Sequence, residues 1–284
     1  MSAAQLHDGA ALDVTIIGEG PTVLVPVNTG VMEGEAAEQM RAWGADPNLG
    51  RTLATGPGGR RVSRRRRRLR GPPRRLPKPE TLTAANVAAD LLAIADAAEA
   101  ERFAYYGYSW LALAGFQLAL RTDRLTSLAM GGYPPFDGPY EAMLTVTRAA
   151  HRMALANRDN PPAPVDVQSG DWDAVEVTQS PEQTQQYVTL YESLREFDDR
   201  TALDYLTLPR LVFAGASDNI VYGSKWDNAH VVIADAIVQH REQLEAHGWT
   251  VVIVPDADHI AAMQANAVLP ILTPWLRGHL QEQG

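Results

Sequence analysis

The chain has 284 residues, of which 45% are hydrophobic, and a formal net charge of -9 at pH 7. This size and hydrophobic content predict one α/β domain with an insertion or two modest domains. There are no cysteines, which excludes disulfides, thiolate metal sites and a cysteine nucleophile. The N-terminus lacks a signal-peptide pattern, and no apolar stretch approaches the roughly 20 residues that span a bilayer. We therefore expect a cytoplasmic protein without a membrane span.

Strands alternate with helices along most of the chain. The first half predicts strands at 13–17 and 22–27, a helix near 34–43, a helix over 84–100, a strand at 102–106 and a helix over 110–120. The second half predicts strands at 125–131, 210–214 and 250–254, a long helix near 226–247 and a last helix to the C-terminus. This alternation implies βαβ units and a mainly parallel sheet.

One segment, 138–205, breaks the alternation. It predicts helices near 140–156 and 181–197, separated by a proline-rich turn. We expect this segment to be a small helical cap inserted into an α/β core formed by 1–137 and 206–284.

An arginine-rich stretch contrasts with the rest of the chain. Residues 51–75 contain 11 arginines and no acidic residue. Three interpretations of 55–76 stay open: out-of-frame translation between two compensating shifts in a GC-rich gene, a solvated basic loop, or a docking arm for anionic partners. The overall negative charge disfavours nucleic acid as a partner, despite the arginines of 60–75.

A Gly-x-Ser turn lies between an apolar strand and an apolar helix, in the run FAYYGYSWLALAGFQLAL. Gly107 permits a sharp turn, which lifts the Ser109 hydroxyl above the sheet edge beside the helix N-terminus. This context favours Ser109 as a nucleophile. The alternative is an ordinary strand-to-helix turn with a serine N-cap.

A serine nucleophile needs a base and an acid that orients the base. Asp218 follows the strand RLVFA and His259 follows the strand TVVIV, so both lie at carboxyl ends of predicted parallel strands. Asp218 could instead be a turn residue and His259 a surface histidine. Asp256 and Asp258 adjoin the histidine too closely in sequence to be good orienting acids.

Two backbone N–H groups are candidates for stabilising an oxyanion. One belongs to Trp110, directly after the nucleophile, and the other to Asn28, with Val27 as the alternative. The sequence contains no metal-ligand cluster and no phosphate-binding glycine loop, and we expect no metal site.

Apolar and aromatic residues of the expected cap are candidates for the substrate pocket: Met143, Met153, Tyr187 and Tyr191. The alternative is that they only pack the cap on the sheet. His151, in the same segment, is a further candidate for the pocket lining.

At TVLVPVNTG, FAYYGYSW, LVFAGASDNIV and VVIVPDADHI the chain resembles the α/β-hydrolase superfamily, in its capped esterase and lactonase branch, over about 12–280. The resemblance implies an eight-stranded, mostly parallel sheet flanked by helices and a triad of Ser109, Asp218 and His259. It also implies that water hydrolyses an acyl-enzyme without a cofactor, and that the substrate is a small or medium carboxylic ester or lactone.

The chain departs from this family pattern beside the expected nucleophile. Leu111 stands where a glycine is usual, and Pro26-Val27 stand where the oxyanion loop often begins His-Gly. An alternative function is therefore a non-catalytic small-molecule receptor or signalling protein that keeps the fold. The sequence gives no oligomeric state.

Overall fold

A central eight-stranded sheet organises the computed structural model, which describes residues 2–56, 60–64, 77–159, 162 and 170–280. Its strand order is β1-β2-β4-β3-β5-β6-β7-β10. The β1–β2 and β2–β4 pairs are antiparallel and every other neighbouring pair in this sheet is parallel. The strands are β1 (Ser2–Gln5), β2 (Ala11–Ile17), β3 (Thr22–Asn28), β4 (Arg60–Arg64), β5 (Phe103–Tyr108), β6 (Leu125–Gly131), β7 (Arg210–Gly215) and β10 (Trp249–Val254).

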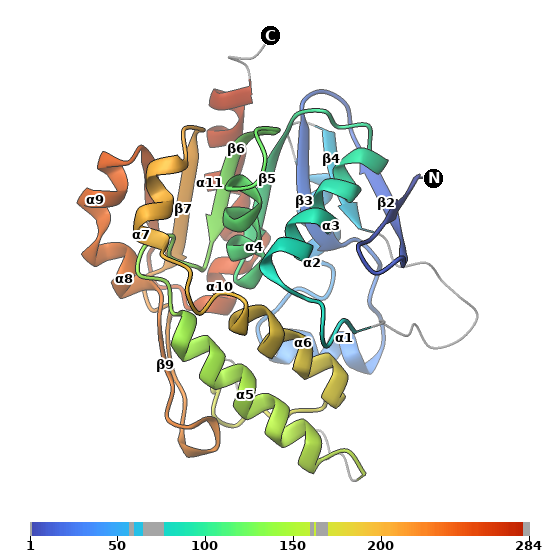
Figure 1. The fold of residues 1–284 in the computed structure, drawn as a ribbon, viewed down its shortest axis with the longest axis vertical. Coiled ribbons are helices and arrows are strands. Elements are labelled where there is room, and N and C mark those ends of the chain that lie inside the picture. Colours follow the sequence, from blue (N-terminus) through green and yellow to red (C-terminus); the bar gives the residue numbers. More distant parts are fainter. Residues whose placement is uncertain (1, 57–59, 65–76, 160–161, 163–169, 281–284) are drawn as a thin grey trace.

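Helices cover both faces of the sheet (Figure 1). One face packs against α3 (Ala84–Ala97), α4 (Trp110–Ala119), α8 (Ala234–Gln239) and α9 (Arg241–Ala246). The other face packs against α2 (Leu49–Thr55), α10 (His259–Met263) and α11 (Ala265–Leu280), while α1 (Glu35–Ala42) precedes α2. The predicted parallel α/β architecture is therefore confirmed.

Strand β5 shows how the sequence produces this two-faced core. Because side chains alternate along a strand, Phe103 and Tyr105 enter one hydrophobic cluster, and Ala104, Tyr106 and Tyr108 enter the cluster on the opposite face. Both faces are covered, so β5 is apolar throughout, as expected for a central parallel strand.

A strand in the arginine-rich stretch was not predicted. The backbone of β4 pairs with β2 on one side and β3 on the other, so 60–64 form a strand in a stretch where the sequence analysis predicted no element. A row of backbone groups between two strands is satisfied by any chain that pairs there, whatever its side-chain pattern. Residues 65–76 lie outside the described residues, and the three interpretations of the stretch stay open.

The single long helix predicted over 226–247 is wrong. A short 3-10 helix (Ser224–Trp226) is followed by β9 (His230–Val232), which pairs with β8 (Asn219–Val221) in a two-stranded antiparallel sheet, and only then by α8 and α9. Asp227 and Asn228 have φ of 58° and 53°, the left-handed conformation that these two residue types tolerate best. They turn the chain back where a continuous helix was expected.

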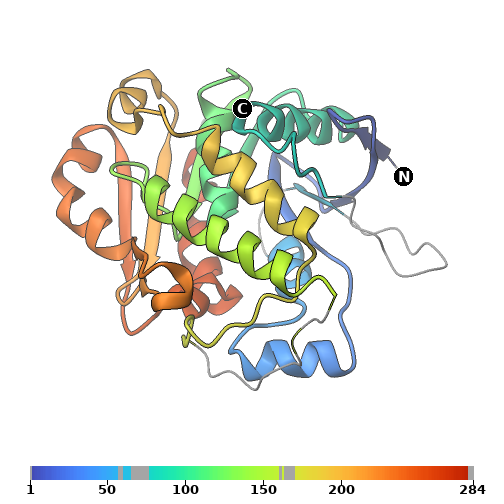
Figure 2. The ribbon, with the colours of Figure 1, turned by 60° about the horizontal axis from the view of Figure 1, so that its bottom comes forward.

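The segment 138–205 contributes α5 (Tyr140–Ala156), α6 (Pro181–Glu192), α7 (Asp199–Ala202) and a 3-10 helix (Leu203–Tyr205). Helices α5 and α6 pack side by side beyond one end of the sheet (Figures 1 and 2). The division of the chain into a core and a cap stays a prediction. Among the described residues, no helix combines the length and apolar character needed to cross a membrane.

Candidate active site

The turn from β5 to α4 holds Ser109 in a strained conformation. Ser109 has φ 57° and ψ -132°, unusual for a residue with a side chain, and its N–H donates to the Gly131 carbonyl at 2.8 Å. A Cβ at Gly107 would lie 2.3 Å from the Leu111 carbonyl oxygen, so only glycine fits there. Ser109 occupies the N-cap position of α4, but its side chain makes no capping hydrogen bond. The hydroxyl is therefore not engaged in the ordinary structural role of an N-cap serine.

Asp218 and His259 form a buried pair. The Nδ1 atom of His259 lies 2.9 Å from Oδ1 and 3.1 Å from Oδ2 of Asp218. The carboxylate is fully buried and the histidine is 8% exposed. Because a carboxylate only accepts hydrogen bonds, this contact assigns the Nδ1 proton as the donor and leaves Nε2 as the ring nitrogen that can act as a base.

A glycine permits the loops that carry this pair to approach each other. Asp218 follows β7 and His259 follows β10, and the Ser217 N–H donates to the Ala257 carbonyl at 2.9 Å. A Cβ at Gly215 would lie 2.2 Å from that same carbonyl oxygen. The close contact between the two loops fixes the acid beside the histidine.

Tyr108 connects the histidine to the nucleophile turn. Its hydroxyl donates to the His259 carbonyl at 2.9 Å, and the two rings lie 5.1 Å apart. Burial raises the pKa of Tyr108 well above its usual value, so the phenol stays a donor. The ends of β5, β7 and β10 therefore meet at one place, although the described structure contains no hydrogen bond between Ser109 and His259.

The two candidate oxyanion donors have different surroundings. Trp110 is the first residue of α4, where backbone N–H groups lack helical partners. Asn28 is the last residue of β3, and its Oδ1 accepts from the Gly30 N–H at 3.1 Å. A Cβ at Gly50 would lie 2.2 Å from the Asn28 carbonyl oxygen, so α2 lies against this backbone. The first donor adjoins the nucleophile, whereas Asn28 is also paired with Arg64 of β4 in the sheet.

Two of the four candidate pocket residues lie on one face of α6. Tyr187 packs edge-to-face on Trp110, with ring centroids 5.6 Å apart, and Tyr191 follows one helical turn later in the core. Met143 and Met153, on α5, are partly buried against the same hydrophobic cluster. His151 contacts the Thr184 hydroxyl at 3.1 Å and joins α5 to α6. Of these residues, Tyr187 has a described ring contact with Trp110, the residue that follows Ser109.

No protein-family model matches the chain, and neither does any curated sequence. Solved structures do match it over nearly its whole length. An esterase from Thermogutta terrifontis has 19% identity and a TM-score of 0.58, and the match covers 98% of each chain. An enol-lactonase from Burkholderia xenovorans has 18% identity and a TM-score of 0.59, covering 97% of this chain and 99% of the other. A hydrolase from Pseudomonas aeruginosa has 20% identity and a TM-score of 0.58, covering 97% of each.

The chain has the α/β-hydrolase fold. The sequence resemblance is thereby confirmed at the level of the fold. Within this α/β-hydrolase fold, Ser109, Asp218 and His259 keep the chain order and strand-end positions that the motifs predicted.

Sequence reasoning missed a tryptophan beside the histidine. Trp172 packs edge-to-face on His259 at 6.0 Å and on Trp43 at 5.6 Å. It belongs to the irregular chain before α6, where no periodic pattern could mark it. Its contacts join the segment after β3 to the segment before α6, directly over the histidine.

The two aspartates beside the histidine have other roles. Asp258 accepts from the Ala261 N–H at 2.8 Å and caps α10, and Asp256 is exposed in a left-handed turn. The described partner of His259 Nδ1 is Asp218 alone. Of the three aspartates, Asp218 is the one with a described hydrogen bond to the histidine ring, and its role as the orienting acid stays a prediction.

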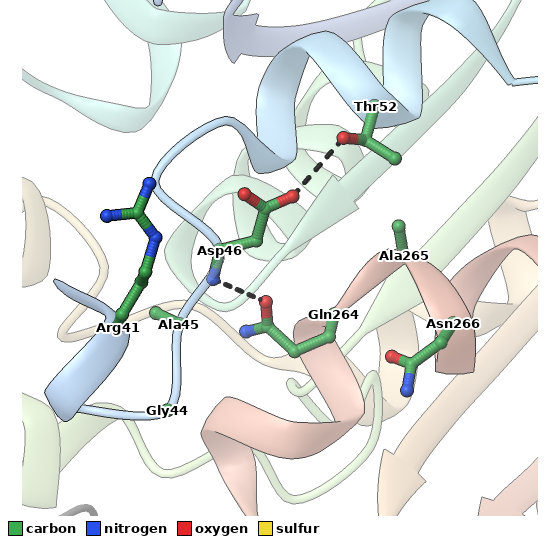
Figure 3. Close-up of a pocket in the computed structure, with 8 residues that line it drawn as sticks. All are labelled: Arg41, Gly44, Ala45, Asp46, Thr52, Gln264, Ala265 and Asn266. Atoms are coloured by element: carbon green, nitrogen blue, oxygen red, sulfur yellow. Dashed lines mark hydrogen bonds between the residues drawn. The ribbon is translucent and has the colours of Figure 1, made fainter. Parts of the chain in front are cut away.

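A separate hollow of about 550 Å³ lies between the α1–α2 connection and the α10–α11 turn (Figure 3). The Asp46 N–H donates to Gln264 Oε1 at 2.9 Å across it, and the Thr52 hydroxyl donates to Asp46 Oδ2 at 3.2 Å. None of the described residues lining this hollow is a predicted site residue.

Proposed function

We propose that the chain is a serine hydrolase that cleaves small or medium carboxylic esters or lactones through an acyl-enzyme. The observation that carries the proposal is the buried Asp218–His259 hydrogen bond at 2.9 Å, beside a serine whose hydroxyl does not cap its helix. The esterase and lactonase among the similar structures agree with this chemistry.

The reaction follows from the arrangement of the three side chains. Ser109 Oγ attacks the ester carbonyl carbon while His259 Nε2 takes its proton, and Asp218 stabilises the resulting imidazolium. The Trp110 N–H faces the developing oxyanion, and Asn28, or alternatively Val27, supplies the second donor. The alkoxide leaves with the proton from His259. Water then loses a proton to His259 and attacks the acyl-enzyme, which releases the carboxylic acid and restores the serine.

Turnover of p-nitrophenyl acetate and butyrate tests the proposal. We expect Ser109→Ala to lower kcat/KM by about 10³-fold or more, because the nucleophile is lost. Ser224→Ala, which removes an exposed hydroxyl far along the chain, should keep the wild-type rate.

Covalent trapping provides a second readout. A p-nitrophenyl phosphonate should add one phosphonyl group to the peptide that contains Ser109, detectable by mass spectrometry, and none to the Ser109→Ala protein. Equal turnover by wild type and Ser109→Ala, with no adduct, would leave the non-catalytic receptor as the better hypothesis.

A further inference from the structure

One aromatic side chain outside the proposed triad lies against the ring of the proposed base. The ring centroids of Trp172 and His259 are 6.0 Å apart and the ring planes meet at 72°, an edge-to-face contact. The ring of Tyr108 lies 5.1 Å from the same imidazole at 57°. The imidazole therefore contacts two aromatic rings, one from the end of β5 and one from the irregular chain before α6.

The hydrogen bond to Asp218 holds only one end of the imidazole. Nδ1 lies 2.9 Å and 3.1 Å from the two carboxylate oxygens, so a small pivot of the ring about Nδ1 keeps one bond or the other. Among the described residues, no hydrogen bond holds Nε2, the nitrogen that takes the serine proton in the proposed reaction. The position of Nε2 therefore depends on the rings that pack against the imidazole.

The segment that carries the tryptophan, residues 170–177, is attached to the loop between β8 and β9. Oδ1 of Asp173 accepts the Gly223 N–H at 3.0 Å, and the Lys225 ammonium lies 3.4 Å from Oε1 of Glu176. A Cβ at Gly223 would lie 2.5 Å from the Asp173 carboxylate, so glycine permits this close approach. These contacts hold the irregular segment 170–177 in place without regular secondary structure.

The indole of Trp172 is itself held by other rings. Trp43, at the end of α1, packs edge-to-face on it with centroids 5.6 Å apart, and the ring of Tyr222 lies 6.5 Å away. A Cβ at Gly170 would lie 3.5 Å from Oδ2 of Asp258, the residue before the histidine. Three separate parts of the chain thus fix the indole beside the imidazole.

We infer that Trp172 is a positioning residue for the proposed reaction: its ring limits the pivot of the His259 imidazole and keeps water from it. The histidine is 8% exposed, in agreement with such a cover. The inference rests on the proposed function, because the position of Nε2 affects turnover only if it takes the proton of Ser109. A displacement of about 1 Å at a reacting group can cost about 100-fold in rate.

Trp172→Leu keeps an apolar side chain and removes the aromatic ring. We expect kcat for p-nitrophenyl butyrate to fall about tenfold while KM changes less than about twofold, because the base is displaced. Trp172→Phe restores an aromatic ring and should recover more than about a third of the wild-type kcat. Trp275 packs edge-to-face on His279 at 4.8 Å, outside the candidate site, so Trp275→Leu is the matched control and should keep the wild-type kcat.

A chemical probe of the histidine needs no esterase activity. Diethyl pyrocarbonate carbethoxylates imidazole nitrogen, and Nε2 is the accessible nitrogen of His259 because Nδ1 is bonded to Asp218. In Trp172→Leu, His259 should react at least about threefold faster than in the wild type, while His279 reacts at its wild-type rate. Trp275→Leu should leave the rate at His259 unchanged. Tandem mass spectrometry assigns each adduct to its histidine.

Asp173→Ala loosens the segment 170–177 without removing the indole. Asp173 is exposed, so this substitution should leave the core folded. Loss of the acceptor for the Gly223 N–H should lower kcat by about twofold to threefold and speed carbethoxylation of His259. Asp173→Asn retains an acceptor oxygen and should give values between those of Asp173→Ala and the wild type.

Failure of the inference and failure of the proposed function give different results. If Trp172→Leu changes neither kcat nor the reactivity of His259, or if every histidine reacts faster to the same extent, Trp172 is not a positioning residue and the hydrolase proposal stands. If the wild type shows no Ser109-dependent turnover, the proposed function is wrong. The carbethoxylation rates then still decide whether Trp172 holds and covers the imidazole.

Discussion

The histidine side and the tyrosine side of the site differ in how their polar groups are satisfied. On the histidine side, Asp218 and His259 hydrogen-bond to each other, and the Tyr108 hydroxyl donates to the histidine backbone. On the tyrosine side, the equally buried phenols of Tyr133 and Tyr191 interact with each other, and no described hydrogen bond ties either hydroxyl to the backbone.

The two sides of the site therefore contribute to the proposed reaction in different ways. A general base must be held in one tautomer and one orientation before substrate arrives, so its partners belong to the protein. Residues that only line a substrate pocket, the role suggested for Tyr187 and Tyr191, take no part in moving this proton. We therefore expect changes on the histidine side to affect every substrate, and changes on the tyrosine side to affect only some.

The largest effect is expected from Asp218→Asn. The amide keeps the size of the side chain but removes the charge that stabilises the imidazolium and fixes Nδ1 as the donor. We expect kcat/KM for p-nitrophenyl butyrate to fall roughly 10³- to 10⁴-fold, as is typical when an orienting carboxylate is neutralised.

Asp256→Asn is the matched control for that change. It removes a carboxylate of the same type from an exposed turn residue near the histidine, and asparagine tolerates the left-handed backbone there. A loss of activity as large as that of Asp218→Asn would show that general charge near the histidine, and not the buried hydrogen bond, governs the rate.

Gly107→Ala is expected to have the next largest effect. The new Cβ would lie 2.3 Å from the Leu111 carbonyl oxygen, which belongs to backbone and cannot turn aside. We expect the free energy of unfolding to fall by about 1–3 kcal/mol, as for overpacking in a core, and the esterase rate to fall as the turn widens.

Gly278→Ala provides the comparison for Gly107. A Cβ there meets nothing within 4 Å, and the residue lies in α11. Alanine stabilises a helix relative to glycine by up to about 1 kcal/mol. The free energy of unfolding of Gly278→Ala, measured with urea, should therefore rise, whereas that of Gly107→Ala falls. Equal changes in the free energy of unfolding for Gly107→Ala and Gly278→Ala would contradict a special steric requirement for glycine in the β5–α4 turn.

The histidine side was largely predictable from sequence, whereas the tyrosine side was not. Ser109, Asp218 and His259 each follow an apolar strand, and the carboxyl ends of parallel strands meet at one edge, so pattern alone indicates their meeting place. Tyr133 lies in a turn and Trp172 in irregular chain, where no period marks a functional side chain. Their contacts depend on how the segment 138–205 packs, which local sequence does not encode.

Two secondary-structure errors have the same physical origin. The backbone of β4 pairs between β2 and β3 in spite of an arginine-rich sequence, and β9 pairs with β8 within a segment where a helix was expected. In both places tertiary pairing of backbone groups overrides the side-chain pattern. Long apolar elements such as α4 and β5 were predicted nearly to their ends, because burial and periodicity agree there.

The smallest expected effect compares a tyrosine bonded to backbone with one whose described partner is another phenol. The Tyr105 hydroxyl donates to the Leu111 carbonyl at 2.7 Å, so Tyr105→Phe leaves a buried acceptor without that donor and should lower the free energy of unfolding by about 1 kcal/mol. Tyr133→Phe removes a hydroxyl whose described partner is the phenol of Tyr191 and not a backbone group, so it should lower the free energy of unfolding by less than Tyr105→Phe does. Urea unfolding of the ligand-free proteins measures both changes. If Tyr133→Phe destabilised the protein as much as Tyr105→Phe, the phenol–phenol contact would stabilise the fold as strongly as the bond to backbone, and the contrast between the two sides of the site would be lost.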